Sequence, residues 1–333
     1  MLLLVRQPPF LTSAHNLPSA EASKGERKIR GITCPPDRVP PFPRQRASPP
    51  APPVYEQTGC LVECMLYYGS YDRVLTLTNS IAGNIFMTRP RAVIFDLGGT
   101  LVDWPDWDED VSRRWSISYD FLVARLPNHD WPERGAYVEA MREAELAHWE
   151  QVVEKQWSGP PSGLLSDGFR RLGRHVDETE LLAALDGYAR AVDGWAVVFP
   201  DAKETLQLLR ERGYRLGLLS NTWWAAEWHN ADLAAHGLDT LIDEVAYTSD
   251  LPHSKPHPSV FLEVASRLDV EPEACVMVGD RMVDDIYGAL GVNMRAVWKK
   301  NDYPWPRPEH IVPTATITHL AELPLLLRSW GGT

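Results

Sequence analysis

From residue 91 onward, short apolar runs alternate with longer segments in which apolar residues recur every three or four positions. The short runs are typical of buried strands, and the longer periodicity is typical of amphipathic helices. The longer segments also carry helix boundary signals. Residues 201–212 open with Asp and end before Gly213, and residues 258–268 open with Pro258. The chain is therefore predicted to alternate strands and helices.

This pattern predicts an α/β fold, a Rossmann-like parallel sheet with helices on both faces. The expected strands share a short apolar run and are residues 92–95, 214–219, 244–247, 275–278, 295–298 and 315–317. The expected helices between them are residues 201–212, 224–236, 258–268 and 284–290.

Residues 103–198 interrupt this alternation. Their helical patterns cover residues 108–125, 133–155, 163–173 and 178–192, with little strand signal. We interpret them as an inserted all-helical cap domain, with residues 87–102 and 199–333 forming the α/β core. An insert directly after the first strand would stand over the carboxyl ends of the strands, where ligands bind in such folds. That is a useful place for a lid.

Residues 1–86 differ from the rest of the chain. They hold 12 of the 28 prolines and have more basic than acidic residues, whereas the remainder is strongly acidic. Such a proline-rich, aperiodic segment is predicted to be disordered. Because Met87 directly precedes the first strand, we hypothesise that residues 1–86 are an upstream extension that is not native.

Overall charge and composition narrow the function. A formal net charge of −12 argues against a nucleic-acid partner, which needs a basic face. No apolar stretch approaches the roughly 18 to 20 residues of a membrane span. The 4 cysteines do not suggest a disulfide framework, so a reducing cytoplasm is the simplest location. The expected partner is a small molecule, and oligomeric state is not predicted.

Polar residues lie at or beyond the carboxyl ends of several predicted strands. They are Asp96 after the first strand, Ser220 with Asn221, Lys255, and Asp280 with Asp284 and Asp285 just beyond. Because the carboxyl ends of parallel strands meet at one edge of a sheet, these groups are expected to converge.

A carboxylate, a hydroxyl, an ammonium group and an acidic cluster together suit phosphoryl transfer. Asp96 could attack phosphorus, while Ser220 and a backbone N–H hold phosphoryl oxygens. Lys255 could neutralise those oxygens, and Asp280 could hold Mg²⁺, which prefers hard oxygen ligands. The predicted substrate is a small phosphorylated molecule.

The four motifs, in this order, resemble the haloacid dehalogenase (HAD)-like hydrolase superfamily, in its helical-cap subgroup. The resemblance covers nearly all of residues 91–320. It implies that Asp96 becomes a phosphoaspartate, that Lys255 belongs to the catalytic site, and that Ser220 and Asn221 bind the phosphoryl group. It also implies a Mg²⁺ site made by Asp96, the Gly98 carbonyl and Asp280, with Asp285 as the outer acidic residue and Asp284 as its alternative.

Gly98 departs from the family pattern. Family phosphatases carry a second carboxylate there, which protonates the leaving oxygen and later activates water. Such acid–base help is typically worth about 10²–10⁴-fold. A glycine cannot supply it, so we expect a preference for leaving groups that depart unprotonated, such as aryl or acyl phosphates, unless a cap residue or water substitutes.

Three alternatives to a Mg²⁺-dependent phosphatase stay open. A 2-haloacid dehalogenase needs no acid at position 98 and no metal, but its acidic cluster would be idle. A phosphonate hydrolase also lacks the second Asp but uses a cap lysine, for which Lys155 is the sole candidate in the insert. A degenerate member that only binds a phosphorylated ligand is the non-enzyme alternative.

Tryptophan is abundant, with 13 residues, many in or beside the insert. Most are expected to form the core of the cap. Trp104, Trp107, Trp223 and Trp224 lie just past the predicted site motifs and are candidates for an aromatic substrate wall.

Overall fold

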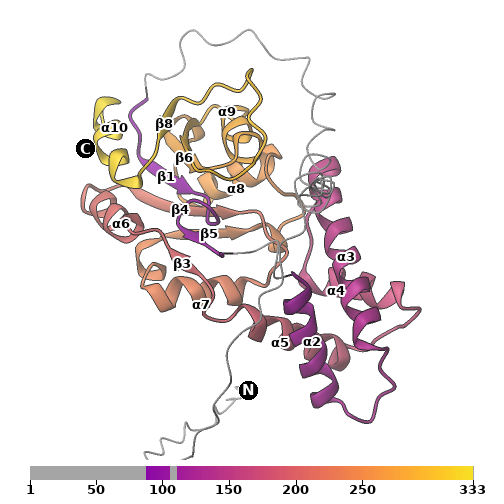
Figure 1. Cartoon of the computed structure of the whole chain (residues 1–333). Coiled ribbons are helices and arrows are strands. Elements are labelled where there is room, and N and C mark those ends of the chain that lie inside the picture. The colour runs from indigo at the N-terminus through magenta and orange to yellow at the C-terminus, as the bar shows by residue number, and fades with distance from the viewer. Residues whose placement is uncertain (1–87, 106–110, 333) are drawn as a thin grey trace, which may run out of the picture. The chain divides into compact units, whose positions relative to one another are not determined.

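The computed structural model describes residues 88–105 and 111–332. The predicted disorder of residues 1–86 and the candidate Trp107 lie outside these ranges. In the part described, a parallel sheet has the strand order β5-β4-β1-β6-β7-β8 (Figure 1). Its strands are β1 (Ala92–Phe95), β4 (Arg215–Ser220), β5 (Glu244–Tyr247), β6 (Cys275–Gly279), β7 (Arg295–Lys299) and β8 (Ala315–Ile317). The predicted Rossmann-like α/β fold is confirmed.

Helices lie between these strands in the chain, and one more follows the last strand. They are α6 (Ala202–Glu211), α7 (Ala226–His236), α8 (Pro258–Arg267), α9 (Gly288–Leu290) and α10 (Leu323–Ser329). Short 3-10 turns lie at Asp239–Leu241, Thr248–Asp250, Pro272–Ala274 and Leu320–Glu322. The segment η5 (Met282–Tyr287), where a regular helix was expected, is a π-helix. This difference matters for the site, because π-helical turns often occur at functional positions.

Alternate residues along each central strand point to opposite faces of the sheet, and both faces are buried. Phe95 and Leu218 pack with α6 and α10 on one face, while Ile94 and Met277 pack with α8 on the other. A strand covered on both sides reads as a continuous apolar run, which explains the short runs in the sequence.

Four helices follow β1 in the chain, and we call them the helical insert. They are α2 (Val111–Arg125), α3 (Arg134–Lys155), α4 (Pro161–Arg171) and α5 (Glu178–Val192). An aromatic and aliphatic cluster that includes Trp115, Tyr137 and Tyr188 holds them together. Trp115 is fully buried in this cluster, as the sequence predicts for tryptophans in the core of the insert.

Two very short strands at the ends of the insert were not predicted. Strand β2 (Val102–Asp103) pairs antiparallel with β3 (Val197–Val198), in the register Val102↔Val198 and Asp103↔Val197. The chain therefore leaves the α/β core and returns to it at neighbouring points.

The insert also makes backbone contacts with the loop before Lys255. Ser254 N donates to Gln156 O at 3.0 Å, and Ser158 N donates to Pro252 O at 3.3 Å.

None of the helices in residues 88–105 and 111–332 has the length and apolar character needed to cross a bilayer.

Candidate active site

The pairing of β1 with its two neighbours determines where Asp96 lies. Phe95 is in register with Leu218 of β4 and with Val278 of β6. The Asp96 N–H then donates to Val278 O at 2.9 Å. Asp96 therefore continues the central strand by one residue, and its side chain emerges at the carboxyl edge of the sheet.

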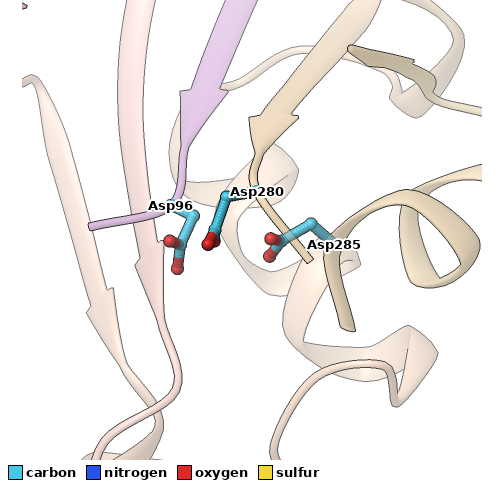
Figure 2. A group of neighbouring side chains, drawn as sticks. All are labelled: Asp96, Asp280 and Asp285. Atoms are coloured by element: carbon cyan, nitrogen blue, oxygen red, sulfur yellow. The ribbon is translucent and has the colours of Figure 1, made fainter. Parts of the chain in front are cut away.

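Three carboxylates meet at this edge. One oxygen each from Asp96, Asp280 and Asp285 lies within 4.8 Å of the other two, and all three residues are buried. Figure 2 shows Asp96 and Asp280 beyond the ends of their strands, with the Asp285 carboxylate directed toward them from the following helical turn. Like charges at this separation repel, so the group needs cations.

Lys255 supplies one of these cations. Its ammonium group lies 2.6 Å from Asp96 Oδ1 and 2.6 Å from Asp285 Oδ1, and it also donates to Leu219 O at 3.0 Å. The Lys255 residue is only 1% exposed. Burial alone would lower the pKa of Lys255, but Asp285 and Asp96 outweigh it, so the pKa is raised and the side chain stays charged.

One lysine does not neutralise three carboxylates. Burial raises the pKa of Asp96 to about 6, against the opposing effect of Lys255. Burial, reinforced by the charge of Asp96, raises the pKa of Asp280 to about 7. Without a further cation, the fully ionised form of this group is therefore disfavoured.

The structure separates Asp284 from Asp285. The Asp285 carboxylate accepts from Lys255 through Oδ1 and from the Arg281 backbone N–H through Oδ2, at 2.9 Å. Asp284 is also buried, but it is paired with Arg281 Nη1 at 3.3 Å and does not belong to the three-carboxylate group. The π-helical turn η5 thus brings Asp285 to Asp96.

Two glycines allow this close approach. Gly99 has φ +76°, and a Cβ atom there would lie 2.5 Å from Asp280 Oδ2. A Cβ atom on Gly279 would overlap the Asp285 carboxyl group. Any side chain at either position would push the carboxylates apart.

Ser220 and Asn221, predicted to bind the phosphoryl group, lie on the same edge. Ser220 is the last residue of β4 and is buried. The amide of Asn221 brackets the backbone of Lys255: Nδ2 donates to Lys255 O at 3.0 Å, and Oδ1 accepts from Lys255 N at 2.7 Å. Asn221 thus holds Lys255 in place, and direct contact of Ser220 and Asn221 with substrate stays a prediction.

Two residues of the site were missed by sequence reasoning. Lys299, at the end of β7, is 3% exposed and donates to Gly99 O at 3.0 Å. Asn301 Nδ2 donates to Asp280 Oδ2 at 2.7 Å. Burial lowers the pKa of Lys299, although Asp280 opposes the shift. Lys299 and Asn301 lie just past the predicted strand 295–298, and this position in the sequence could have identified them as site residues.

The proposed aromatic wall needs a correction. Trp223 and Trp224 are buried, at 0% and 2% exposure, and pack into the core of the insert, so neither lines an open site. Trp104 is half-buried and lies against Gly98.

Comparison with known proteins agrees with this geometry. Residues 90–293 match the model of the haloacid dehalogenase-like hydrolases. The chain belongs to this family, and it is a hydrolase with the family's fold.

Three relatives show the range within the family. Glyceraldehyde 3-phosphate phosphatase of Methanopyrus kandleri is 32% identical over 62% of this chain and 82% of its own length. A solved HAD phosphatase from Thermococcus onnurineus is 28% identical with a TM-score of 0.50, covering 71% of this chain and 97% of that one. A 2-haloacid dehalogenase from Pseudomonas syringae is 26% identical with a TM-score of 0.54, covering 72% of this chain and 99% of that one.

Proposed function

We propose that this hydrolase is a Mg²⁺-dependent phosphatase that acts on a small phosphorylated molecule, with Asp96 as the nucleophile. The observation that carries the proposal is the buried group of Asp96, Asp280 and Asp285 at the carboxyl edge of the sheet, in which Lys255 pairs with Asp96 and Asp285. Relatives named as phosphatases in Methanopyrus kandleri and Thermococcus onnurineus support the same reaction class.

The residues present fit a Mg²⁺ ion. Asp280 Oδ1 is buried and has no hydrogen-bond partner among the described residues, as expected for an atom that faces a cation. The donors are hard carboxylate oxygens, which Mg²⁺ prefers. Asp96, Asp280 and the Gly98 carbonyl would hold the ion, and Asp285 would be the outer acidic residue of the site. When bound, the ion would neutralise negative charge on the phosphoryl group.

The chain's own groups then have distinct tasks. Asp96 attacks phosphorus, and the bond from phosphorus to the leaving oxygen breaks. Lys255 keeps Asp96 ionised and oriented, and it offsets charge on the phosphoryl oxygens. Asn221 holds the Lys255 backbone, and Ser220 binds a phosphoryl oxygen. Water then attacks the phosphoaspartate and releases phosphate.

We also propose that residues 103–198 act as a cap domain over this edge, with residues 87–102 and 199–333 as the core. The backbone contacts between Gln156–Ser158 and Pro252–Ser254 support this, because they tie the insert to the loop that carries Lys255. The cytoplasmic location stays a prediction from cysteine usage.

The test is a hydrolysis screen on aryl, acyl and alkyl phosphates and on 2-chloropropionate, with added Mg²⁺ and after chelation. Phosphate release should require Mg²⁺, and Asp96→Asn should lower it by at least about 10³-fold. Asp186→Asn, an exposed change on α5, is the matched control and should keep full activity. Metal-independent phosphate release would contradict the proposal.

A 2-haloacid dehalogenase is the second candidate, favoured by Gly98 and by the similarity to the Pseudomonas syringae enzyme. In that reaction Asp96 would attack carbon and halide would leave without a proton. Chloride release from 2-chloropropionate in the presence of a chelator would favour this candidate over the phosphatase.

The phosphonate alternative has less support. Lys155 is exposed, and its ammonium group lies over the Trp157 ring, 5.3 Å from the ring centroid. No contact between Lys155 and Asp96 is seen in residues 88–105 and 111–332. A protein that binds phosphate without turning over any substrate in the screen would instead be the degenerate member.

A further inference from the structure

The space beside Gly98 is filled by the Trp104 ring. A Cβ atom built on Gly98 would lie 3.1 Å from Trp104 Cζ3 and 3.8 Å from Trp104 Cε3. The first distance is tighter than ordinary van der Waals contact, so even an alanine at this position requires the indole to move. The φ of Gly98 is not positive, so its backbone does not itself demand glycine.

Trp104 is held in place on several sides. Its ring centroid lies 5.6 Å from that of Trp224 and 5.7 Å from that of His229, both in edge-to-face arrangements. Its backbone N–H donates to Asp103 Oδ1 at 2.9 Å, and Asp103 also accepts from the Tyr303 hydroxyl. An indole packed in this way cannot swing aside without breaking these contacts.

The indole is also a poor neighbour for a carboxylate. The ring would displace the water that stabilises the charged form. An acidic side chain at position 98 would therefore meet a steric obstacle and would also lose part of its solvation.

We propose that Gly98 and Trp104 are a matched pair, in which the indole takes the volume that an acidic side chain at position 98 would need. The pair, and not Trp104 alone, then determines specificity. It restricts the enzyme to phosphorylated substrates whose leaving oxygen departs without a proton, namely aryl and acyl phosphates. This inference rests on the proposed phosphatase function.

The chemistry balances without an acid. Asp96 forms a bond to phosphorus, and the electron pair of the broken bond leaves with the aryl or acyl oxygen as an anion. A water oxygen then attacks phosphorus and the bond to Asp96 breaks. The carboxylate is thereby restored, and the protons of that water pass to the phosphate product and to solvent.

The experiment measures kcat/KM for a series of substituted aryl phosphates and for alkyl phosphates. In the native enzyme, kcat/KM should fall steeply as the pKa of the leaving group rises. Gly98→Asp alone should leave that slope unchanged, as should Trp104→Ala alone. The double variant should flatten it and raise turnover of alkyl phosphates on the order of 10²-fold, the lower end of acid–base assistance. A comparable gain from Gly98→Asp alone would overturn the proposal.

A stability cycle tests the pair without relying on turnover. Gly98→Ala should lower the midpoint of thermal unfolding in the native background but not in the Trp104→Ala background, because only the indole opposes the added methyl group. Additive shifts would overturn the pairing even if the enzyme is a phosphatase. A third outcome is that the shifts are non-additive but no phosphate ester is hydrolysed. The steric pairing of Gly98 with Trp104 would then stand, but the proposed phosphatase function and the substrate restriction that rests on it would both be overturned.

Discussion

Lys255 is a single buried ammonium group that serves two carboxylates from different parts of the chain. Removing one partner from a buried charged pair typically costs about 3–5 kcal/mol, because the remaining charge is left uncompensated. Lys255→Met would leave Asp96 and Asp285 without this partner.

We therefore predict that Lys255→Met lowers the free energy of unfolding by about 3–5 kcal/mol in chelator and abolishes turnover. Urea unfolding at neutral pH measures the first effect. Lys203→Met, at an exposed lysine of α6, is the control and should change stability by less than about 0.5 kcal/mol. Equal free energies of unfolding for the two variants would contradict this prediction, because they would mean that Lys255 does not offset the charges of Asp96 and Asp285.

For individual residues, the sequence predicts the location of side chains that directly follow the end of a strand. Asp96 and Asp280 each follow a strand of a parallel sheet directly, so their convergence depends only on topology. Lys255 lies in the loop after β5, where Asn221 holds its backbone. Lys299, Asn301 and Trp104 belong to the same edge, but their contribution depends on where each side chain points. Trp104 and Asn301 lie outside strands and helices, where periodicity carries no information on that direction, and Lys299 is the last residue of β7.

Helices α2 and α5 of the insert approach closely at Gly187. A Cβ atom there would lie 2.7 Å from Ser118 O and 2.8 Å from Ser118 Cα, both backbone atoms that cannot yield locally. Alanine would gain about 0.8–1 kcal/mol of helix propensity over glycine. Overpacking typically costs about 1–3 kcal/mol, so the steric cost outweighs the gain in propensity.

Gly187→Ala should therefore destabilise the protein, whereas Gly163→Ala should be neutral or stabilising, because no atom lies within 4 Å of a Cβ at Gly163 in α4. The two variants make the same chemical change in two helices, so their difference isolates packing. Calorimetric unfolding checks it, and a rise in the midpoint for Gly187→Ala would contradict the close approach of α2 and α5.

For most elements, the sequence predicts the position to within one or two residues. The expected strand 214–219 is β4 (Arg215–Ser220), and the expected helix 163–173 is α4 (Pro161–Arg171). Strands of two residues such as β2 and β3 carry no detectable period. The π-helical form of η5 depends on the tertiary contacts of Asp285, which local propensity does not encode.

At the scale of the whole molecule, the buried side chain of His229 makes a contribution to stability that is lost in mild acid. His229 is 3% exposed, contacts Thr222 Oγ1 at 2.8 Å and stacks between Trp224 and Tyr247. Burial lowers the pKa of His229 from 6.5 to about 3. Below pH 6.5 the unfolded chain therefore binds a proton at this position that the folded protein does not bind, so the contribution of His229 to stability falls as pH falls. The raised pKa values of Asp96 and Asp280 act in the opposite direction.

The contribution of His229 amounts to about 2 kcal/mol between pH 7 and pH 5. We predict that His229→Gln is less stable than the native protein at neutral pH, but that the difference between the two free energies of unfolding shifts by about 2 kcal/mol in favour of the variant when the pH is lowered from 7 to 5. Urea unfolding at the two pH values measures it, and His175→Gln, at an exposed position, is the control. An unchanged pH slope in His229→Gln would show that the imidazole is protonated in the folded state.

The antiparallel pair formed by β2 and β3 has a consequence for folding kinetics. Neighbouring strands β1 and β4 are separated in sequence by the whole insert, so their pairing has a high contact order. When the four helices have folded and Val102 has paired with Val198, the ends of the insert are held next to each other. The entropy cost of closing the loop between β1 and β4 is then small. The rate of sheet formation should then depend on how fast the insert folds. The insert should also tolerate changes in length that would disrupt strand pairing if they were made within the sheet.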